Sequence, residues 1–352
     1  MIFSKARLMP YIESISERID RKNDVSYNED NGVYTIQTCR EDFRILQLTD
    51  IHLGGALLSY GRDIKALKAS EKLIRHTKPN LVVITGDLTF PKRGLMYSLD
   101  NKRLVRTFAA FMRQLGVPWA FTFGNHDTEI WAALNGHEMS SLLAAIAKKD
   151  SLLLYPLTQP QITGRNNQLI EIINEDGSIR QALFLIDSNA YIDEKTRRYD
   201  FVHDDQVAWY RENVLRLRKE QGENVSSFVF LHIPLQQYRT AYELYRSGSD
   251  EVKYFFGFNE EDGYGKVCCS SKPSALFDTA KELGSTKGFF CGHDHYNNMS
   301  LEYKGIRLTY GMSIDYLVKR GIVHKERQRG GTLITCRHDG GVDIEQIPLS
   351  EI

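Results

Sequence analysis

The sequence contains few cysteines and no motif that pairs them. Its 352 residues include five cysteines, an odd number, and no CxxC pair occurs. This pattern fits neither a disulfide framework nor a thiolate zinc site. The adjacent residues Cys268 and Cys269 are interpreted as ordinary thiols in a loop. A reduced, cytoplasmic protein fits this cysteine usage best.

Long apolar segments and an excess of charge of either sign are also missing. No stretch approaches the roughly 20 apolar residues that span a bilayer. The N-terminal segment MIFSKARLMP carries charges from Lys5 onward, which does not fit a secretory signal or a membrane anchor. Lys plus Arg equals Asp plus Glu at 45 each, so no global field draws the chain onto nucleic acid or an anionic membrane. Any recognition of phosphate must therefore be local.

The remaining composition is that of an ordinary globular protein, with 42% hydrophobic and 26% charged residues. We find no internal repeat, low-complexity tract or linker that would divide the chain. We therefore expect an N-terminal extension over residues 1–40 and one large domain over residues 41–352. The oligomeric state is left open by the sequence.

Short apolar runs, rich in β-branched and aromatic residues, predict strands that are buried on both faces. These runs are FRILQLTD, NLVVITGD, VPWAFTFGNHD, ALFLIDSN, SSFVFLHIP and KGFFCGHDH. Helical spacing of apolar residues appears between several of them, over residues 62–78, 100–115, 204–220 and 274–283. Residues 166–178 and 247–272 are predicted to be long connections, and residues 305–352 to form strands at the edge of a second sheet. The alternation predicts an α/β fold.

Polar side chains with metal-binding atoms follow nearly every predicted strand. Because open α/β sheets place ligands outside the carboxyl ends of their strands, these side chains are expected at one site. They are Asp50, His52, Asp87, Asn125, His126, His232, His293 and His295. Carboxylate, amide and imidazole ligands suit Mn, Fe or Zn. The set is too large for one four-coordinate ion and is sufficient for two divalent ions that share a bridging carboxylate.

In these blocks and their order the sequence resembles the calcineurin-like metallophosphoesterase superfamily, whose signature is DxH, GD, GNHD or GNHE, H, and GHxH. The resemblance spans roughly Phe43 to Tyr316. The stretches FLHIPL, GHDHYNN and IRLTYG look most like the Dcr2-type and purple-acid-phosphatase-like branch. The resemblance implies a four-layer αββα sandwich, in which two mixed β-sheets are flanked by helices.

The resemblance also implies a role for each metal-binding side chain. Asp50, His52 and His295 would bind the first ion; Asn125, His232 and His293 would bind the second; Asp87 would bridge them. A hydroxide held between the ions would attack phosphorus in line with the leaving oxygen. His126 would protonate or stabilise that oxygen. Asp127 and Asp294 are candidates for orienting a neighbouring imidazole, or are capping residues.

One position departs from the family pattern. Red-purple members place a tyrosine three residues beyond the bridging aspartate, and protein phosphatases place an aspartate there to partner the catalytic histidine. This chain has Phe90, which cannot ligate iron. The tyrosinate-to-iron colour should be absent, and the orientation of His126 must come from another residue. Four residues after other predicted strands are expected at the pocket rim, namely Asn189, Tyr191, Gln236 and Tyr238.

These observations predict a metal-dependent phosphatase that hydrolyses phosphomonoesters of a small molecule or a phosphoprotein. A phosphodiesterase acting on nucleotides or lipid head groups is the main alternative, since the same metal centre serves both reactions. A binding scaffold without catalysis is a further alternative. No basic stripe interleaved with aromatic residues occurs, which argues against a nuclease.

Overall fold

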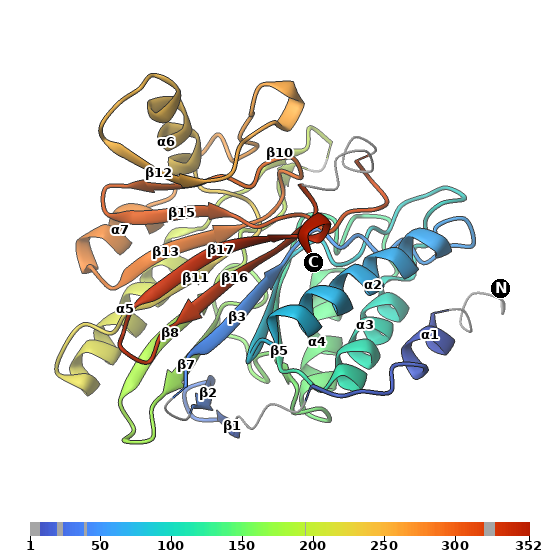
Figure 1. Cartoon of the computed structure of the whole chain (residues 1–352), viewed down its shortest axis with the longest axis horizontal. Helices are drawn as coiled ribbons and strands as arrows, with labels where there is room; N and C mark the ends of the chain where they lie inside the picture. The colour runs from blue at the N-terminus through green and yellow to red at the C-terminus, as the bar shows by residue number, and fades with distance from the viewer. Residues whose placement is uncertain (1–7, 20–23, 39–40, 194, 320–327) are drawn as a thin grey trace.

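Two mixed β-sheets pack face to face at the centre of the computed structural model, which describes residues 8–19, 24–38, 41–193, 195–319 and 328–352 (Figure 1). One sheet has nine strands within these residues and the other has six. Helices cover the outer face of each sheet (Figure 1). The predicted four-layer αββα arrangement is confirmed.

Parallel pairs form the middle of each sheet, and antiparallel pairs lie at both edges of the nine-stranded sheet and at one edge of the six-stranded sheet. The six-stranded sheet has the order β17 (Val342–Pro348), β16 (Gly330–Cys336), β3 (Phe43–Leu48), β4 (Leu81–Thr85), β5 (Trp119–Thr122) and β6 (Leu153–Leu154). The nine-stranded sheet has the order β1 (Asp24–Asn28), β2 (Val33–Gln37), β7 (Gln168–Ile173), β8 (Ile179–Leu185), β11 (Ser227–Phe230), β13 (Thr286–Cys291), β15 (Ile306–Tyr310), β14 (Ser300–Tyr303) and β12 (Val252–Phe256). A separate hairpin pairs β9 (Tyr191–Asp193) with β10 (Arg198–Tyr199).

The helices lie in two groups. The six-stranded sheet is covered by α1 (Met9–Glu13), α2 (Tyr60–Thr77), α3 (Asn101–Leu115) and α4 (Gly136–Ala147), and the nine-stranded sheet by α5 (Asp204–Gln221), α6 (Gln236–Arg246) and α7 (Leu276–Leu283). Helix α3 shows how the local sequence fixes its ends. The side chain of Asp100 accepts a hydrogen bond from the backbone N–H of Arg103 at the start. Gly116 adopts the left-handed conformation at the end, which glycine reaches without steric penalty.

Three apolar layers hold these elements together. One lies between the six-stranded sheet and its helices, and another lies between the nine-stranded sheet and its helices. The third fills the space between the sheets with residues such as Ile45, Leu183, Phe230 and Phe290. The stacked rings of Phe230 and Phe290, with centroids 5.1 Å apart, belong to this inner layer. The two sheets are therefore held as one unit, and their strand ends keep fixed relative positions.

The described residues of the N-terminal segment pack against the helices or pair with the sheet. Ile12 of α1 is buried against the helical layer beside α3. Strand β2 pairs in parallel with β7 and continues the nine-stranded sheet. Ile12 therefore belongs to the apolar layer between the six-stranded sheet and its helices, and β2 belongs to the nine-stranded sheet. Residues 1–7, 20–23 and 39–40 of the predicted extension lie outside the described part of the chain, and the division at residue 40 stays a prediction.

Most of the predicted elements are confirmed, and two differ. The six apolar runs form β3, β4, β5, β8, β11 and β13. Residues 166–178, predicted to be a connection, instead contain β7, whose residues alternate between the two apolar layers. The 247–272 connection includes the edge strand β12. The C-terminal residues contribute β15 to one sheet and the β16–β17 edge to the other.

The cysteines and the helices of the described residues can be compared with the composition of the chain. The described cysteines Cys268, Cys269, Cys291 and Cys336 are free thiols. None of the described helices combines the length and the apolar character that a bilayer crossing requires.

The inner layer should dominate the stability of the fold. Leu183 is fully buried between the sheets, whereas Leu215 on α5 is 43% exposed. We expect Leu183→Ala to lower the free energy of unfolding by about 2–5 kcal/mol, because it removes buried methyl groups and leaves a cavity. The matched Leu215→Ala should change it by less than about 1 kcal/mol. Urea unfolding followed by tryptophan fluorescence measures both, and equal effects would refute the assignment of the inner layer.

Candidate metal centre

The carboxyl ends of parallel strands from both sheets meet at one place. Asp50 and His52 follow β3, Asp87 follows β4, and Asn125 with His126 follows β5 of the six-stranded sheet. His232 follows β11, and His293 with His295 follows β13 of the nine-stranded sheet. The donor atoms of the aspartates and histidines fall into groups whose members all lie within 4.8 Å of one another, and Oδ1 of Asn125 lies 3.2 Å from Nε2 of His232. Every side chain predicted to bind metal is therefore brought to a common site.

The backbone at this site is held in an unusual conformation. Asp50, His52, Asp87 and His293 all have positive φ, at 53°, 51°, 54° and 77°. Residues other than glycine rarely adopt this region, because the Cβ atom crowds the backbone. Such strain clusters at functional sites, where the surrounding structure enforces it. The chain therefore turns sharply after β3, β4 and β13, where these side chains enter the site.

Two motif glycines allow the loops to approach one another. A Cβ atom on Gly124 would lie 2.1 Å from Oδ1 of Asp87, and one on Gly292 would lie 1.9 Å from Oγ1 of Thr49. Both distances are far below a van der Waals contact. The glycines before Asn125 and His293 are thus required by the close packing of loops from different strands.

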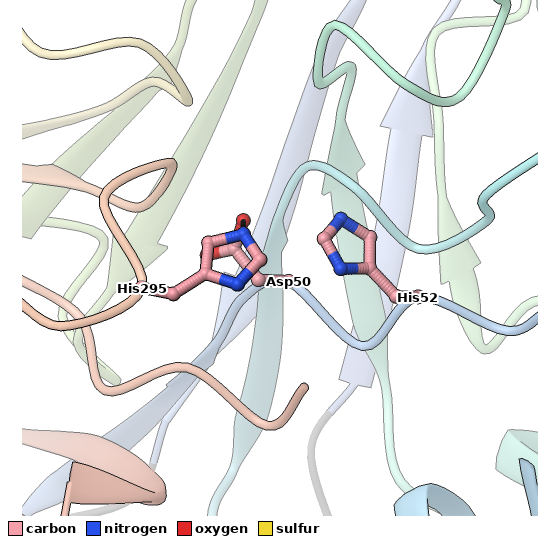
Figure 2. Close-up of side chains that lie close together, drawn as sticks. All are labelled: Asp50, His52 and His295. Atoms are coloured by element: carbon pink, nitrogen blue, oxygen red, sulfur yellow. Dashed lines mark ion pairs between the residues drawn. The ribbon is translucent and has the colours of Figure 1, made fainter. Parts of the chain in front are cut away.

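The first group of ligands consists of Asp50, His52 and His295, which Figure 2 shows close together. The rings of the two histidines have centroids 4.9 Å apart, and Nε2 of His295 lies 3.4 Å from Oδ1 of Asp50. Asp315 lies behind both rings, with Oδ2 at 2.9 Å from Nδ1 of His295 and Oδ1 at 3.5 Å from Nδ1 of His52. A carboxylate on the far nitrogen orients a histidine for metal binding through the other nitrogen.

The second group contains Asn125, His232 and His293, and Asp87 lies between it and the first. Oδ2 of Asp87 is 3.1 Å from Nε2 of His52 and 3.2 Å from Nε2 of His232. Oδ1 of Asn125 lies 3.2 Å from the same His232 nitrogen. His232 donates from Nδ1 to the backbone carbonyl of Thr85 at 2.8 Å, which leaves Nε2 for a metal ion. The position of Asp87 fits the bridging role that was predicted for it.

The donor set fits a pair of divalent cations. Asp50 and Asp87 are each 1% exposed, and Oδ1 of Asp50 is a buried oxygen that has no hydrogen-bond partner among the described residues. A buried carboxylate oxygen without a partner is costly, and a metal ion would satisfy it. The mixture of carboxylate, amide and imidazole suits Mn, Fe or Zn. The residues at this site therefore match the group that the sequence predicts there.

The electrostatics of the site point the same way. Burial alone would lower the pKa of His52, but the carboxylates of Asp315 and Asp87 outweigh it and raise the pKa to about 10. Burial would raise the pKa of Asp87, yet His232 and His126 hold it well below its ordinary value. This raised pKa favours a protonated His52 between the two carboxylates. A cation must displace that proton, so metal affinity should fall as the pH falls.

His126 lies beside both groups, and its orienting partner is a residue that the sequence analysis missed. Nδ1 of His126 is 2.6 Å from Oε1 of Glu129, a side chain that is 6% exposed. The backbone N–H of His126 donates to Oδ1 of Asp87 at 2.8 Å. Phe90 packs against the imidazole, with ring centroids 4.5 Å apart. Glu129 thus takes the place of the partner that Phe90 cannot provide, and its spacing in GNHDTE is the signal that could have revealed it.

The two aspartates proposed to orient an imidazole have other roles. Asp127 accepts hydrogen bonds from the backbone N–H groups of Asp87, Thr89 and Gly124, each at 2.9 Å. Its carboxylate thereby joins the loops after β4 and β5. Asp294 accepts from the backbone N–H of Cys268 and from the hydroxyl of Tyr310. Glu129 and Asp315 contact the imidazoles instead.

The four rim candidates are placed differently from one another. Oη of Tyr191 accepts a hydrogen bond from Nδ2 of Asn125 at 2.8 Å, so it lies at the site. Asn189 bonds to the carbonyl of Phe201 and to Gln206, and Gln236 bonds to the carbonyl of Ser270. The prediction that Tyr238 lies at the pocket rim is wrong. This residue is 3% exposed, and its hydroxyl donates to backbone carbonyls of β13 and β15. Helix α6 begins directly after the loop and turns this ring into the core.

The arrangement of ligands agrees with comparisons to known proteins. The profile described as calcineurin-like phosphoesterase matches residues 43–297, which include every residue of the two ligand groups. The chain belongs to the calcineurin-like phosphoesterase family. Within this family, the probable inactive purple acid phosphatases 28 and 14 of Arabidopsis thaliana are 26% and 27% identical, over 88% and 78% of this chain and 80% and 71% of theirs.

Two other relatives support the branch and the fold. The phosphatase DCR2 of Saccharomyces cerevisiae is 26% identical over 77% of this chain and 47% of its own length. The predicted Dcr2-type and purple-acid-phosphatase-like branch of the calcineurin-like phosphoesterases is thus confirmed. The crystal structure of a dimetal phosphatase from Danio rerio aligns with a TM-score of 0.55 at 13% identity, over 88% of this chain and 97% of that one, which shows the same fold.

Asp315 offers a direct test of the metal centre. We expect Asp315→Asn to weaken Mn²⁺ binding by about 10- to 100-fold, because it removes the carboxylate charge that supports two predicted ligands. Calorimetric titration of the metal-stripped protein measures the affinity. Asp343→Asn, on the exposed edge strand β17, is the matched control and should bind Mn²⁺ like the wild type. Equal affinity in the two variants would show that Asp315 does not support a metal site.

Proposed function

We propose that this chain hydrolyses phosphomonoesters with two divalent metal ions bound where the strand ends of the two sheets meet. The observation that carries the proposal is the position of the Asp87 carboxylate, which contacts His52 of one ligand group and His232 of the other. Asp50, His52 and His295 would hold one ion and Asn125, His232 and His293 the other, with Asp87 shared. When bound, such a pair polarises phosphoryl oxygens and supplies an activated water for in-line displacement.

The residues of the chain supply the acid for the leaving group. His126 is held by Glu129 on Nδ1, so its other ring nitrogen is directed by a fixed hydrogen bond. We assign it the protonation of the leaving oxygen, a role that contributes on the order of 10²- to 10⁴-fold in rate. Phe90 offers no phenolate, so the site favours divalent over ferric iron, and Mn²⁺, Fe²⁺ and Zn²⁺ are the expected metals.

The names of the plant relatives raise a second candidate function, which is binding without catalysis. Both plant relatives named above carry the words "probable inactive". In this chain, every predicted ligand position holds a competent side chain and His126 is present beside them. We therefore favour hydrolysis, of a phosphorylated small molecule or a phosphoprotein, over a scaffold role. Free thiols at Cys268, Cys269, Cys291 and Cys336 support a reducing compartment, and we propose the cytoplasm.

The first test compares a phosphomonoester with the matching diester. Metal-stripped protein should hydrolyse 4-nitrophenyl phosphate after addition of Mn²⁺, and should act more slowly on bis(4-nitrophenyl) phosphate. Asp87→Asn should lose both the activity and most of the bound metal, because the shared carboxylate is gone. Preference for the diester would favour nucleotide or lipid substrates. Metal binding without turnover of either ester would favour the scaffold.

The role of Glu129 can be isolated through the leaving group. Glu129→Gln should slow hydrolysis of an alkyl phosphate by about 10- to 100-fold, because an alkoxide leaving group needs the proton from His126. Hydrolysis of 4-nitrophenyl phosphate should change little, since nitrophenolate leaves without protonation. Glu175→Gln, in the exposed β7–β8 turn, is the control. A uniform loss for both substrates would contradict a role of Glu129 in positioning the acid.

A further inference from the structure

The hairpin formed by β9 and β10 lies against the second ligand group. The hydroxyl of Tyr191 on β9 meets the Asn125 amide at 2.8 Å. The ring of Tyr199 on β10 packs edge-on against His293, with centroids 4.6 Å apart. Tyr191 and Tyr199 stack on each other at 5.7 Å. Through these contacts the hairpin occupies a fixed position beside the proposed metal ligands.

The turn of this hairpin places one cation next to the proposed acid. Nη2 of Arg197 lies 3.0 Å from each carboxylate oxygen of Glu129, the residue that also contacts His126. The guanidinium lies 5.5 Å from the centroid of the Tyr191 ring. Arg197 has a left-handed backbone with φ of 49°, which is strained for arginine. The backbone is thus strained at Arg197, the residue whose guanidinium contacts Glu129.

Most of the hydrogen-bonding capacity of Arg197 is left for a ligand. A guanidinium carries five N–H donors in a planar fork. Glu129 engages Nη2, and among the described residues the Nε and Nη1 groups of Arg197 have no hydrogen-bond partner. The side chain is 54% exposed. Arg197 is therefore a cation fixed at one nitrogen, with its remaining donors accessible from the solvent side.

Tyr191 supplies a second donor on the same hairpin. Its oxygen accepts a hydrogen bond from the Asn125 amide, so its hydroxyl hydrogen is not used in that contact. Asn125 in turn presents its Oδ1 atom toward His232. The hairpin therefore holds one neutral and one cationic donor beside the proposed second metal site and the proposed acid.

We propose that Arg197 is a specificity-determining residue that binds the non-bridging oxygens of a dianionic phosphomonoester. A guanidinium forms paired, charge-assisted hydrogen bonds to phosphate oxygens. A phosphodiester carries a single negative charge, and an ester group replaces one of the oxygens that Arg197 would bind. Arg197 thus makes the site prefer monoesters. This inference rests on the proposed function, because it concerns the substrate of that same site.

Direct ligand binding tests the inference without relying on turnover. In Mn²⁺-loaded protein at mildly alkaline pH, calorimetry compares inorganic phosphate, which is then mainly a dianion, with dimethyl phosphate, a monoanion. Arg197→Ala should weaken binding of phosphate by about 10- to 100-fold, the range expected for loss of charge-assisted hydrogen bonds. Dimethyl phosphate should bind as it does to the wild type. Arg197→Lys should restore part of the phosphate affinity, because a lysine keeps the charge but not the fork.

A neighbouring residue provides the control, and kinetics provide the second measurement. Arg198→Ala removes an exposed arginine of the same hairpin whose Nε contacts Thr196, and it should leave both affinities unchanged. In Arg197→Ala, the ratio of kcat/KM for 4-nitrophenyl phosphate to that for its diester should fall by the same factor as the phosphate affinity, mainly through KM.

Three results would overturn the inference. These are phosphate binding that does not depend on Arg197, equal weakening of both ligands, and absence of phosphate binding to the metal-loaded wild type. Equal weakening would mean that Arg197 acts through Glu129 on the metal centre as a whole. If the wild type hydrolyses neither ester while phosphate binding still depends on Arg197, the proposed function fails and the assignment of Arg197 stands.

Discussion

The arrangement of the site depends on the contacts that the Asp87 carboxylate makes. It lies 3.1 and 3.2 Å from histidines that follow strands of different sheets, and it accepts the backbone N–H of His126 from a third loop. A buried carboxylate needs such partners to remain ionised. The packing of the two sheets brings these partners together, so the apolar layer around Phe230 and Phe290 is what makes a charged centre possible. Hydrophobic packing and metal chemistry are linked through this one side chain.

Carboxylates outside the predicted ligand set hold the histidine rings in position. Asp315 supports His52 and His295, and Glu129 supports His126. The loop that carries Asp315 is itself anchored by Arg329, a buried guanidinium that donates to the backbone carbonyls of Ile314 and Asp315. Arg329 directly precedes β16, the strand that pairs with β3. The C-terminal edge of the six-stranded sheet therefore helps to orient ligands that follow strands much earlier in the chain.

Sequence patterns revealed the parts of the site that are encoded locally. Asp87 and His293 could be predicted because each directly follows a glycine at the end of an apolar run, and strand and ligand are adjacent in the chain. Asp315 could not be predicted as a partner of His52, since nothing in the sequence brings positions so far apart together. Arg197 was missed for the same reason. Tyr238 shows the opposite error: a residue that follows a strand end closely in sequence is turned into the core by the first turn of α6.

The left-handed backbone at Asp50, His52, Asp87 and His293 also bears on how long the folded protein survives. Strain of this kind raises the energy of the native state by about 1–3 kcal/mol at each position. Any cation that binds the folded chain and not the unfolded one shifts the folding equilibrium in the opposite direction, by an amount that grows with its concentration. The supply of metal in the surroundings of this protein would then set its resistance to proteolysis, and so its abundance, as well as its chemistry.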